Sequence, residues 1–301
     1  MLNEDINLKT IAYNDVQLDN SVVCLGKFQG LHKGHMLLVN KTIELAQNNG
    51  LNSVIFTINV SNQKRIYTDV ERKILLSDMG FDYNVTCEFS KEFASMTPRQ
   101  FVENILIDKL GAKYVVVGTD FRFGCERKGD VSLLMTLGKE YGFEVIAIEK
   151  LSVDGTVVSS SYIRELVEAG NMPLVEKFMG RPYSISGIVT KGKQLGRTIG
   201  FPTVNIYPSK EKLVPLYGVY SSYAYIDDKR VCGMTNIGCN PTVNSSDEIF
   251  VETNLFDFDM DAYGRDIVVY LEYFVRPEMK FNSIDELKEQ IDKDKEFILH
   301  Q

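Results

Sequence analysis

The first half of the chain alternates short apolar runs with stretches whose apolar residues recur at helical spacing. The spacing predicts helices that each end at a glycine, and the third should begin with Thr97 as its cap and Pro98 at its first position. Strands separated by helices of about 10–15 residues are typical of crossover units, so we expect an α/β domain with a parallel sheet. The predicted strands lie at 21–28, 51–60, 112–121 and 141–151, and the predicted helices at 34–50, 69–80 and 97–111.

From residue 181 onward the pattern changes to strand, turn, strand. Runs rich in Tyr, Val and Ile lie at 183–192, 217–238, 249–258 and 266–275. The Asp227–Asp228 pair marks a hairpin turn inside the second run. Short strands of this kind favour a closed antiparallel barrel. We therefore expect two domains, 1–180 and 181–301, that meet near Gly180.

The last segment, 283–298, returns to a helical pattern. Ser283 and Glu286 have the spacing of a capping box. The apolar residues of the segment fall on one stripe of the predicted helix, at Ile284, Leu287, Ile291 and Ile298. We expect a terminal amphipathic helix in the second domain.

Composition narrows the class of protein. The chain has 301 residues, enough for two domains, and its net charge of -8 argues against a nucleic-acid partner. The five cysteines show no C-x-x-C spacing, which favours free thiols in a reducing compartment. The N-terminus is polar and acidic, unlike a signal peptide, and no apolar run approaches the roughly 20 residues that span a bilayer. We expect a cytoplasmic protein without a membrane partner, and the sequence indicates no particular protein partner.

Two of the three histidines, His32 and His35, lie in one H-x-G-H turn directly after the first predicted strand. A strand that ends in a Gly-rich loop and leads into a helix is typical of phosphate binding, because the free amides and the helix dipole favour an anion. Gly30 and Gly34 would let the backbone approach a ligand closely. Two imidazoles there could donate hydrogen bonds to phosphate oxygens while charge develops on them. The pairing favours this interpretation over two ordinary loop histidines.

Two other stretches carry charge beside predicted helices and strands. In "VVSSSYIRELVEAGN", Arg164 would lie in the first turn of a helix, where the dipole disfavours a cation. It is therefore either solvated or directed at a bound anion. In "VVVGTDFRFGCERKGD", Asp120, Arg122, Arg127 and Lys128 follow a strand. For Arg127 and Lys128 a solvated loop is the simpler interpretation.

A second group of candidate residues lies in the second half. Glycines, Gly192 and Gly200 among them, alternate with basic residues in a stretch that suits an oligophosphate but is not a Walker A sequence. Thr203 and Asn205 would share one face of a strand, where a hydroxyl and an amide oxygen could hold Mg²⁺ that arrives with a nucleotide. Glu252 lies among apolar residues of a predicted strand. It is either an exposed carboxylate or a general base for an alcohol.

In their order and spacing, these motifs resemble the bacterial bifunctional riboflavin kinase/FMN adenylyltransferase family, also called FAD synthetase. The resemblance runs nearly end to end and is carried by "GKFQGLHKGH", "VVVGTDFRFG", "SSSYIR", "IGCNPTV" and "VETNLFDF", among others. It implies a Rossmann-like nucleotidyltransferase domain that adenylates FMN to FAD with ATP. It also implies a six-stranded barrel that phosphorylates riboflavin to FMN with ATP and Mg²⁺. Riboflavin, FMN and ATP would be its small-molecule partners, with FMN and FAD as products.

The resemblance also implies roles for individual residues. His32 and His35 correspond to the adenylyl-transfer histidines, Thr203 and Asn205 to the Mg–ATP pair of the kinase, and Glu252 to its general base. It further implies nucleotide contacts at Gly26, Phe28, Gly34, Asp120, Ser160, Ser161, Arg164, Gly192 and Gly200.

The chain departs from the family pattern at several positions. Gln29 stands where the family usually has Asp, and Asn59 where it usually has the acid of "FDPHP". Val204 replaces a small Ala, and Asn254 stands where His is common. The first two changes imply that adenylylation is the slower activity. A riboflavin kinase with a weakened or inactive first domain, or a non-catalytic flavin-binding regulator, are the alternatives, and the intact metal pair and base argue against the regulator.

Overall fold

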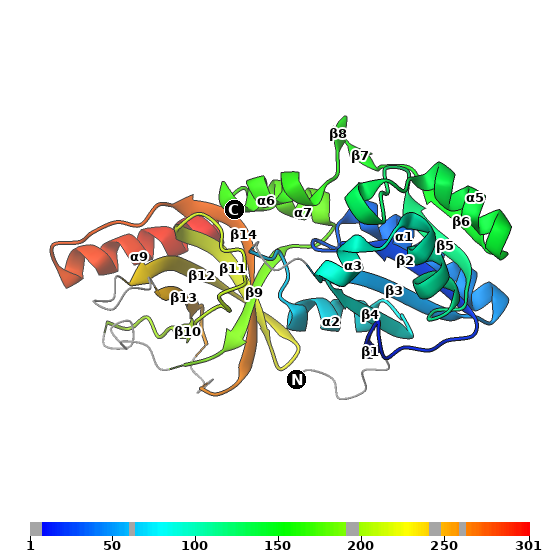
Figure 1. The fold of residues 1–301 in the computed structure, drawn as a ribbon. Helices are drawn as coiled ribbons and strands as arrows, with labels where there is room; N and C mark the ends of the chain where they lie inside the picture. Colours follow the sequence, from blue (N-terminus) through cyan, green and yellow to red (C-terminus); the bar gives the residue numbers. More distant parts are fainter. Residues whose placement is uncertain (1–7, 60–63, 191–198, 241–247, 259–262) are drawn as a thin grey trace. The chain divides into compact units, whose positions relative to one another are not determined.

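The computed structural model describes residues 8–59, 64–190, 199–240, 248–258 and 263–301. The chain divides into two compact units (Figure 1). The N-terminal unit holds residues up to 160 except for 64–66, and the C-terminal unit holds 64–66 together with 161–301. The domain boundary near Gly180 stays a prediction.

A six-stranded sheet forms the centre of the N-terminal unit. Its order is β1-β4-β3-β2-β5-β6, and every neighbouring pair is parallel. The parallel α/β sheet is therefore confirmed, and two short strands, β1 and β4, extend it beyond the predicted four. The strands are β1 (Lys9–Ala12), β2 (Ser21–Gly26), β3 (Asn52–Asn59), β4 (Tyr83–Glu88), β5 (Ala112–Gly118) and β6 (Glu144–Ile148).

The helices of this unit agree with the predicted starts more closely than with the predicted ends. Thr97 caps its helix in a capping box with Gln100, and Pro98 is the first helical residue. From Val102 the helix continues with π-type hydrogen bonds to Ile107, so the predicted helix over 97–111 is present but changes type after its first turn and ends earlier. The helical elements are α1 (Lys33–Asn49), α2 (Asp69–Asp78), α3 (Lys91–Ser95), α4 (Pro98–Phe101), η1 (Val102–Ile107), η2 (Cys125–Arg127) and α5 (Val131–Tyr141), and β7 (Ser152–Val153) and β8 (Thr156–Val157) form a small hairpin. The next helix, α6 (Ser160–Glu168), belongs to the C-terminal unit from Ser161 onward.

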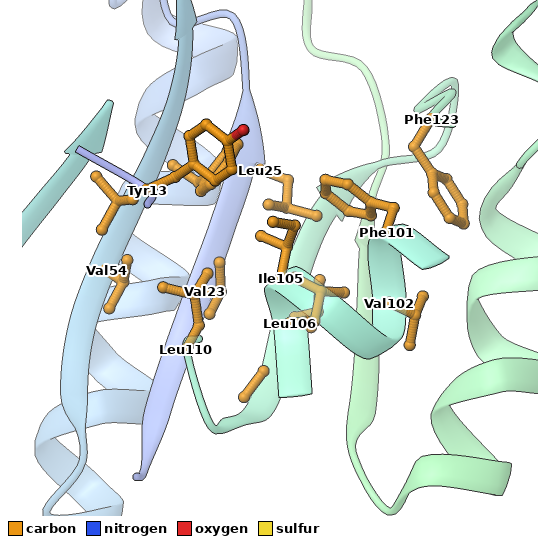
Figure 2. Close-up of a cluster of buried hydrophobic side chains, with 14 of the residues drawn as sticks. Tyr13, Val23, Leu25, Val54, Phe101, Val102, Ile105, Leu106, Leu110 and Phe123 are labelled. Carbon is orange, nitrogen blue, oxygen red and sulfur yellow. The ribbon is translucent and has the colours of Figure 1, made fainter. Parts of the chain in front are cut away.

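Alternation along β2 directs its side chains to opposite faces of the sheet. Val23 and Leu25 join the main apolar cluster with Phe101 and Ile105 (Figure 2). Cys24 lies on the other side, within hydrogen-bond reach of the Thr42 hydroxyl of α1, and its burial raises the pKa of the thiol to about 12. Both faces of the central strand are thus covered, as in other parallel sheets.

The strand order reverses direction beside β2, because β3 lies on one side of it and β5 on the other. In open α/β sheets, ligands bind outside the carboxyl ends of the strands at such a reversal. The loop that contains His32 follows β2, and the loop that contains Asp120 follows β5. The topology therefore predicts a ligand site at this edge of the sheet.

The C-terminal unit contains an antiparallel six-stranded sheet in the order β10-β13-β12-β11-β14-β9. An isolated bridge between Thr190 and Asn205 joins its two edges into a barrel. The predicted hairpin turn is confirmed, because Asp227 and Asp228 adopt left-handed φ values of 48° and 63°. The strands are β9 (Tyr183–Ile188), β10 (Val204–Ile206), β11 (Gly218–Ile226), β12 (Lys229–Asn240), β13 (Glu248–Leu255) and β14 (Asp266–Arg276), and α7 (Met172–Met179) precedes them.

The terminal helix, α9 (Ile284–Leu299), confirms the predicted element but not every detail. The Ser283 side chain accepts from the Glu286 backbone N–H, whereas the Glu286 carboxylate accepts from the Asn282 N–H, so only half of the capping box forms. Ile284 is 53% exposed and does not share the buried stripe, which Ile298 does. The helix is tied to β14 by a nearly buried ion pair, in which the Arg276 guanidinium lies 2.8 Å from the Asp294 carboxylate.

Residues 64–66 connect two parts of the N-terminal unit, yet they are bound within the C-terminal unit. The Arg65 N–H donates to the Glu211 carbonyl at 2.6 Å, and the Leu213 N–H donates to the Arg65 carbonyl at 2.7 Å. The buried Lys212 ammonium donates to the Ile66 carbonyl at 2.8 Å.

Candidate active site

The two histidines of the first loop are stacked on each other at the start of α1. His32 is the N-cap of the helix, and its Nδ1 accepts from the His35 N–H at 3.2 Å. The ring centroids are 3.6 Å apart and the planes differ by 12°. The N-cap bond fixes the neutral tautomer of His32, because an accepting Nδ1 leaves the proton on Nε2.

Burial keeps both imidazoles neutral. Desolvation lowers the pKa of His32 to about 4 from its ordinary 6.5, and it lowers the pKa of His35 well below the ordinary value, with a further contribution from His32. Among the residues that the structure describes, the buried His35 Nδ1 has no hydrogen-bond partner. A buried polar atom without a partner is costly, so the loop holds this nitrogen at an energetic cost.

The loop before the histidines has an unusual backbone. Phe28 and Leu31 adopt φ values of 44° and 41°, a backbone region that residues other than glycine rarely adopt. Both residues are fully buried. A Cβ on Gly26 would lie 3.0 Å from the Phe28 ring, and one on Gly34 would lie 3.3 Å from the His32 Nδ1. Close packing of the loop therefore favours glycine at both positions, apart from any contact with a nucleotide.

The other predicted nucleotide contacts of the first domain have mixed surroundings. Asp120 follows β5 at the same sheet edge, and the Lys150 ammonium lies 2.8 Å from its carboxylate. Ser160 begins α6 and is the last residue of the N-terminal unit, whereas Ser161 and Arg164 belong to the C-terminal unit. Arg164 is the fifth residue of α6, beyond its first turn, and its guanidinium donates to the Lys64 carbonyl. It is therefore held by protein, an outcome that neither sequence alternative included.

An apolar pocket of about 420 Å³ opens at the carboxyl ends of β2 and β3. Six phenylalanines line it: Phe56, Phe89, Phe93, Phe101, Phe121 and Phe123. Arg122 and Arg127 also contribute to its wall, so the interpretation of Arg127 as a merely solvated residue is incomplete. Lys128 pairs with Glu126 at the surface, as expected of a solvated loop. Sequence reasoning missed this pocket, although the phenylalanines of "FRFG" directly after a strand were a signal.

Asn59, one of the departures from the family pattern, ends β3 opposite Glu88 of β4. Its amide nitrogen donates to the Glu88 carboxylate at 2.7 Å, and its amide oxygen accepts from the Arg72 guanidinium at 2.9 Å. An amide can satisfy an anion and a cation at once, whereas a carboxylate here would face Glu88 with like charge.

In the C-terminal unit, the three residues predicted for phosphoryl transfer lie together. The Thr203 hydroxyl donates to the Glu252 carboxylate at 2.7 Å, and the Asn205 amide donates to the Thr203 oxygen at 3.3 Å. Asn205 and Glu252 are direct cross-strand partners on β10 and β13. Glu252 is partly buried, so the interpretation as an exposed strand carboxylate is wrong.

Thr203 and Glu252 of this cluster line a pocket of about 190 Å³ between the barrel and α9. Thr203, Glu252, Asn236 and Asn254 are among its polar lining residues, while Leu287 and Ile291 of α9 provide apolar wall. A second hollow of about 480 Å³ adjoins it and includes Gly200. The predicted glycine at 192 and its basic neighbours lie outside the described residues.

Comparison with known proteins extends over both units. A family model described as FAD synthetase matches residues 15–162, and one described as riboflavin kinase matches residues 179–300. A bifunctional riboflavin kinase/FMN adenylyltransferase from Escherichia coli K12 is 35% identical over 286 residues, which cover 92% of this chain and 91% of that protein. The chain belongs to the riboflavin kinase/FMN adenylyltransferase family.

The chain is also similar to other known proteins. The protein of that name from Bacillus subtilis is 35% identical over 289 residues, which cover 92% of this chain and 90% of that protein. A crystal structure named as a macrolide-efflux protein from Streptococcus pneumoniae is 31% identical, with a TM-score of 0.87 over 97% of this chain and 99% of that one. Within the described ranges of this family member, no helix has the length and apolar character needed to cross a bilayer.

Proposed function

We propose that the chain carries two ATP-dependent transferase activities. The C-terminal unit phosphorylates riboflavin to FMN, and the N-terminal unit adenylates FMN to FAD. The observation that supports this best is the hydroxyl–carboxylate–amide cluster of Thr203, Glu252 and Asn205 beside a pocket, in a chain whose other unit carries a stacked histidine pair at a helix start.

In the kinase reaction, the 5′-hydroxyl of riboflavin attacks the γ-phosphorus of ATP. A new oxygen–phosphorus bond forms, the bond to ADP breaks, and the hydroxyl proton must leave. Glu252 accepts this proton, since its carboxylate already accepts a hydrogen bond from one hydroxyl, that of Thr203, at 2.7 Å. The apolar wall from α9 gives the flavin ring a surface to pack against.

The residues present fit a magnesium ion that arrives with the nucleotide. Thr203 and Asn205 offer a hydroxyl and an amide oxygen, the hard oxygen ligands that Mg²⁺ accepts beside phosphates. Among the described residues, no cluster of three His, Cys, Asp or Glu side chains could hold a metal without the nucleotide. When bound, the ion would neutralise charge on the transferring phosphate.

In the adenylyl reaction, an FMN phosphate oxygen attacks the α-phosphorus of ATP and pyrophosphate leaves. Catalysis of this kind depends on placement and on hydrogen bonds to the charged oxygens. The neutral His32 can donate through Nε2–H, and the His35 ring stacks directly against it. The phenylalanine-lined pocket at the same sheet edge suits the flavin ring, because its walls are apolar and aromatic.

Free thiols support a working environment that is reducing, and so a cytoplasmic location. All five cysteines are unpaired. Cys24 and Cys87 are buried, and burial raises the pKa of each thiol to about 12, so neither is reactive.

The experiment that tests the proposal follows flavins by chromatography. Purified protein is incubated with riboflavin, ATP and Mg²⁺, and separately with FMN, ATP and Mg²⁺. FMN in the first reaction and FAD in the second are the expected products. FMN without FAD would establish the kinase with an inactive first domain, and neither product would leave only the flavin-binding regulator.

A further inference from the structure

Asn254 is a buried polar residue to which the proposed mechanism assigns no role. It lies on β13, two residues after Glu252, and its side chain is 8% exposed. Its amide nitrogen donates to the Pro202 carbonyl at 2.7 Å. A buried amide that donates to one particular carbonyl specifies the position of the segment that carries this carbonyl.

The segment in question is the one that presents Thr203. β10 begins at Val204, so Pro202 and Thr203 precede the strand ladder. The position of Thr203 is then set by side chains rather than by the ladder. Two bonds from the same strand hold it, because Glu252 accepts from its hydroxyl and Asn254 binds the carbonyl directly before it.

The location of Asn254 also relates to both hollows of the C-terminal unit. It lines the pocket of about 190 Å³ that contains Glu252 and the hollow of about 480 Å³ that contains Gly200. Only Phe201 and Asn254 are common to the two linings as described. Asn254 therefore lies where the two hollows meet, and from there it can fix the position of the segment between two bound substrates.

We propose that Asn254 is a positioning residue for phosphoryl transfer. It fixes the Pro202 carbonyl and thereby holds the Thr203 hydroxyl at Glu252, ready for the nucleotide. The inference rests on the kinase activity proposed above. It predicts that a side chain at this position must donate a hydrogen bond, whereas its exact shape matters less.

Three substitutions separate the donor from the shape. Asn254→Leu keeps the approximate volume and removes the donor. Asn254→Asp keeps the shape but places a carboxylate against a carbonyl oxygen, where it cannot donate when ionised. Asn254→His restores an N–H donor. Thr235→Val is the matched control, because the buried Thr235 hydroxyl bonds within the barrel, to Ser222 at 2.7 Å and to Thr253 at 2.9 Å, but lines neither hollow.

The readouts are kcat and KM for ATP and for riboflavin, the affinity for Mg–ADP by calorimetry, and Tm. We expect Asn254→Leu and Asn254→Asp to lower kcat/KM for ATP by roughly 10–100-fold, the range for losing a supporting contact of a ligand residue, and to weaken Mg–ADP binding in parallel. Asn254→His should remain within a few-fold of the natural chain. Thr235→Val should lower Tm without changing KM for ATP.

The outcomes distinguish the two proposals. If the natural chain makes no FMN, the proposed function fails, and Asn254 is not at issue. If the natural chain is active but Asn254→Leu keeps its ATP parameters and Mg–ADP affinity, the positioning role is refuted. It is also refuted if Asn254→Leu behaves like Thr235→Val, with lower Tm and unchanged KM. Conversion of supplied FMN to FAD should be equal in all variants, because the N-terminal unit is unchanged.

Discussion

Acidification from pH 7 to pH 5 should destabilise the N-terminal unit through His32. In the folded chain the pKa of His32 is about 4, while the ordinary value of 6.5 applies when the chain unfolds. Between these two values the unfolded chain binds a proton that the folded chain does not. Stability contributed by the neutral imidazole is therefore complete above about pH 6.5 and is lost as the pH falls towards 4.

The magnitude follows from the interval. At pH 5 the unfolded imidazole lies 1.5 units below its ordinary pKa of 6.5, and the folded one remains neutral. One unit corresponds to about 1.4 kcal/mol, so the loss between pH 7 and pH 5 should be about 2 kcal/mol. The physical cause is that protonation would place a cation in a buried site and would remove the Nδ1 acceptor that caps α1.

Two variants isolate this contribution. His32→Asn keeps a good N-cap without a titrating ring, and His300→Asn removes an exposed histidine at the end of α9. Urea unfolding is followed by circular dichroism, since the chain has no tryptophan. The free energy of unfolding lost between pH 7 and pH 5 should be smaller in His32→Asn than in the natural chain by about 2 kcal/mol. His300→Asn should match the natural chain. If the free energy of unfolding lost between pH 7 and pH 5 differed between His32→Asn and the natural chain by less than about 0.5 kcal/mol, the conclusion that His32 is a buried, neutral imidazole would be refuted.

Three further predictions concern activity, each read by flavin chromatography. Glu252→Gln should nearly abolish FMN formation while supplied FMN is still converted to FAD, and an unchanged kinase rate would remove Glu252 as the base. His35→Ala should slow FAD formation by roughly 10²–10³-fold and spare the kinase, and a natural FAD rate would exclude a role in transfer. Asn59→Asp should slow FAD formation because Glu88 lies 2.7 Å from the amide. Adding Glu88→Gln should restore the rate, and a faster single variant would contradict this reasoning.

Local patterns predicted the framework of both units. The apolar run before the H-x-G-H turn became β2, and the helical spacing that ends at Gly50 became α1, with Gly50 in a left-handed conformation at its end. The Asp227–Asp228 turn was predictable because its conformation is set by adjacent residues. β1 and β4 were missed. For β1 the reason is that a four-residue edge strand, Lys9–Ala12, has little apolar pattern of its own.

The side-chain arrangement of the sites was less accessible. The closeness of Thr203 and Glu252 could be expected only from the family resemblance, because strand pairing across 49 residues leaves no local signal. The hold of Asn254 on Pro202 depends on the same pairing. The neutral state of the histidines depends on burial, which arises from the fold of the whole loop.

Residues 64–66 have a consequence for any attempt to separate the two activities by truncation. A fragment that starts at 161 would lack the segment to which the Glu211 carbonyl, the Leu213 N–H and the buried Lys212 ammonium bind. A fragment that ends at 160 would carry this segment with its polar groups in water instead. No single cut of the chain gives two pieces that each keep their own contacts. The C-terminal unit is thus completed by three residues that lie within the sequence of the other unit, so a clean separation of the two units would have to carry residues 64–66 across to the barrel.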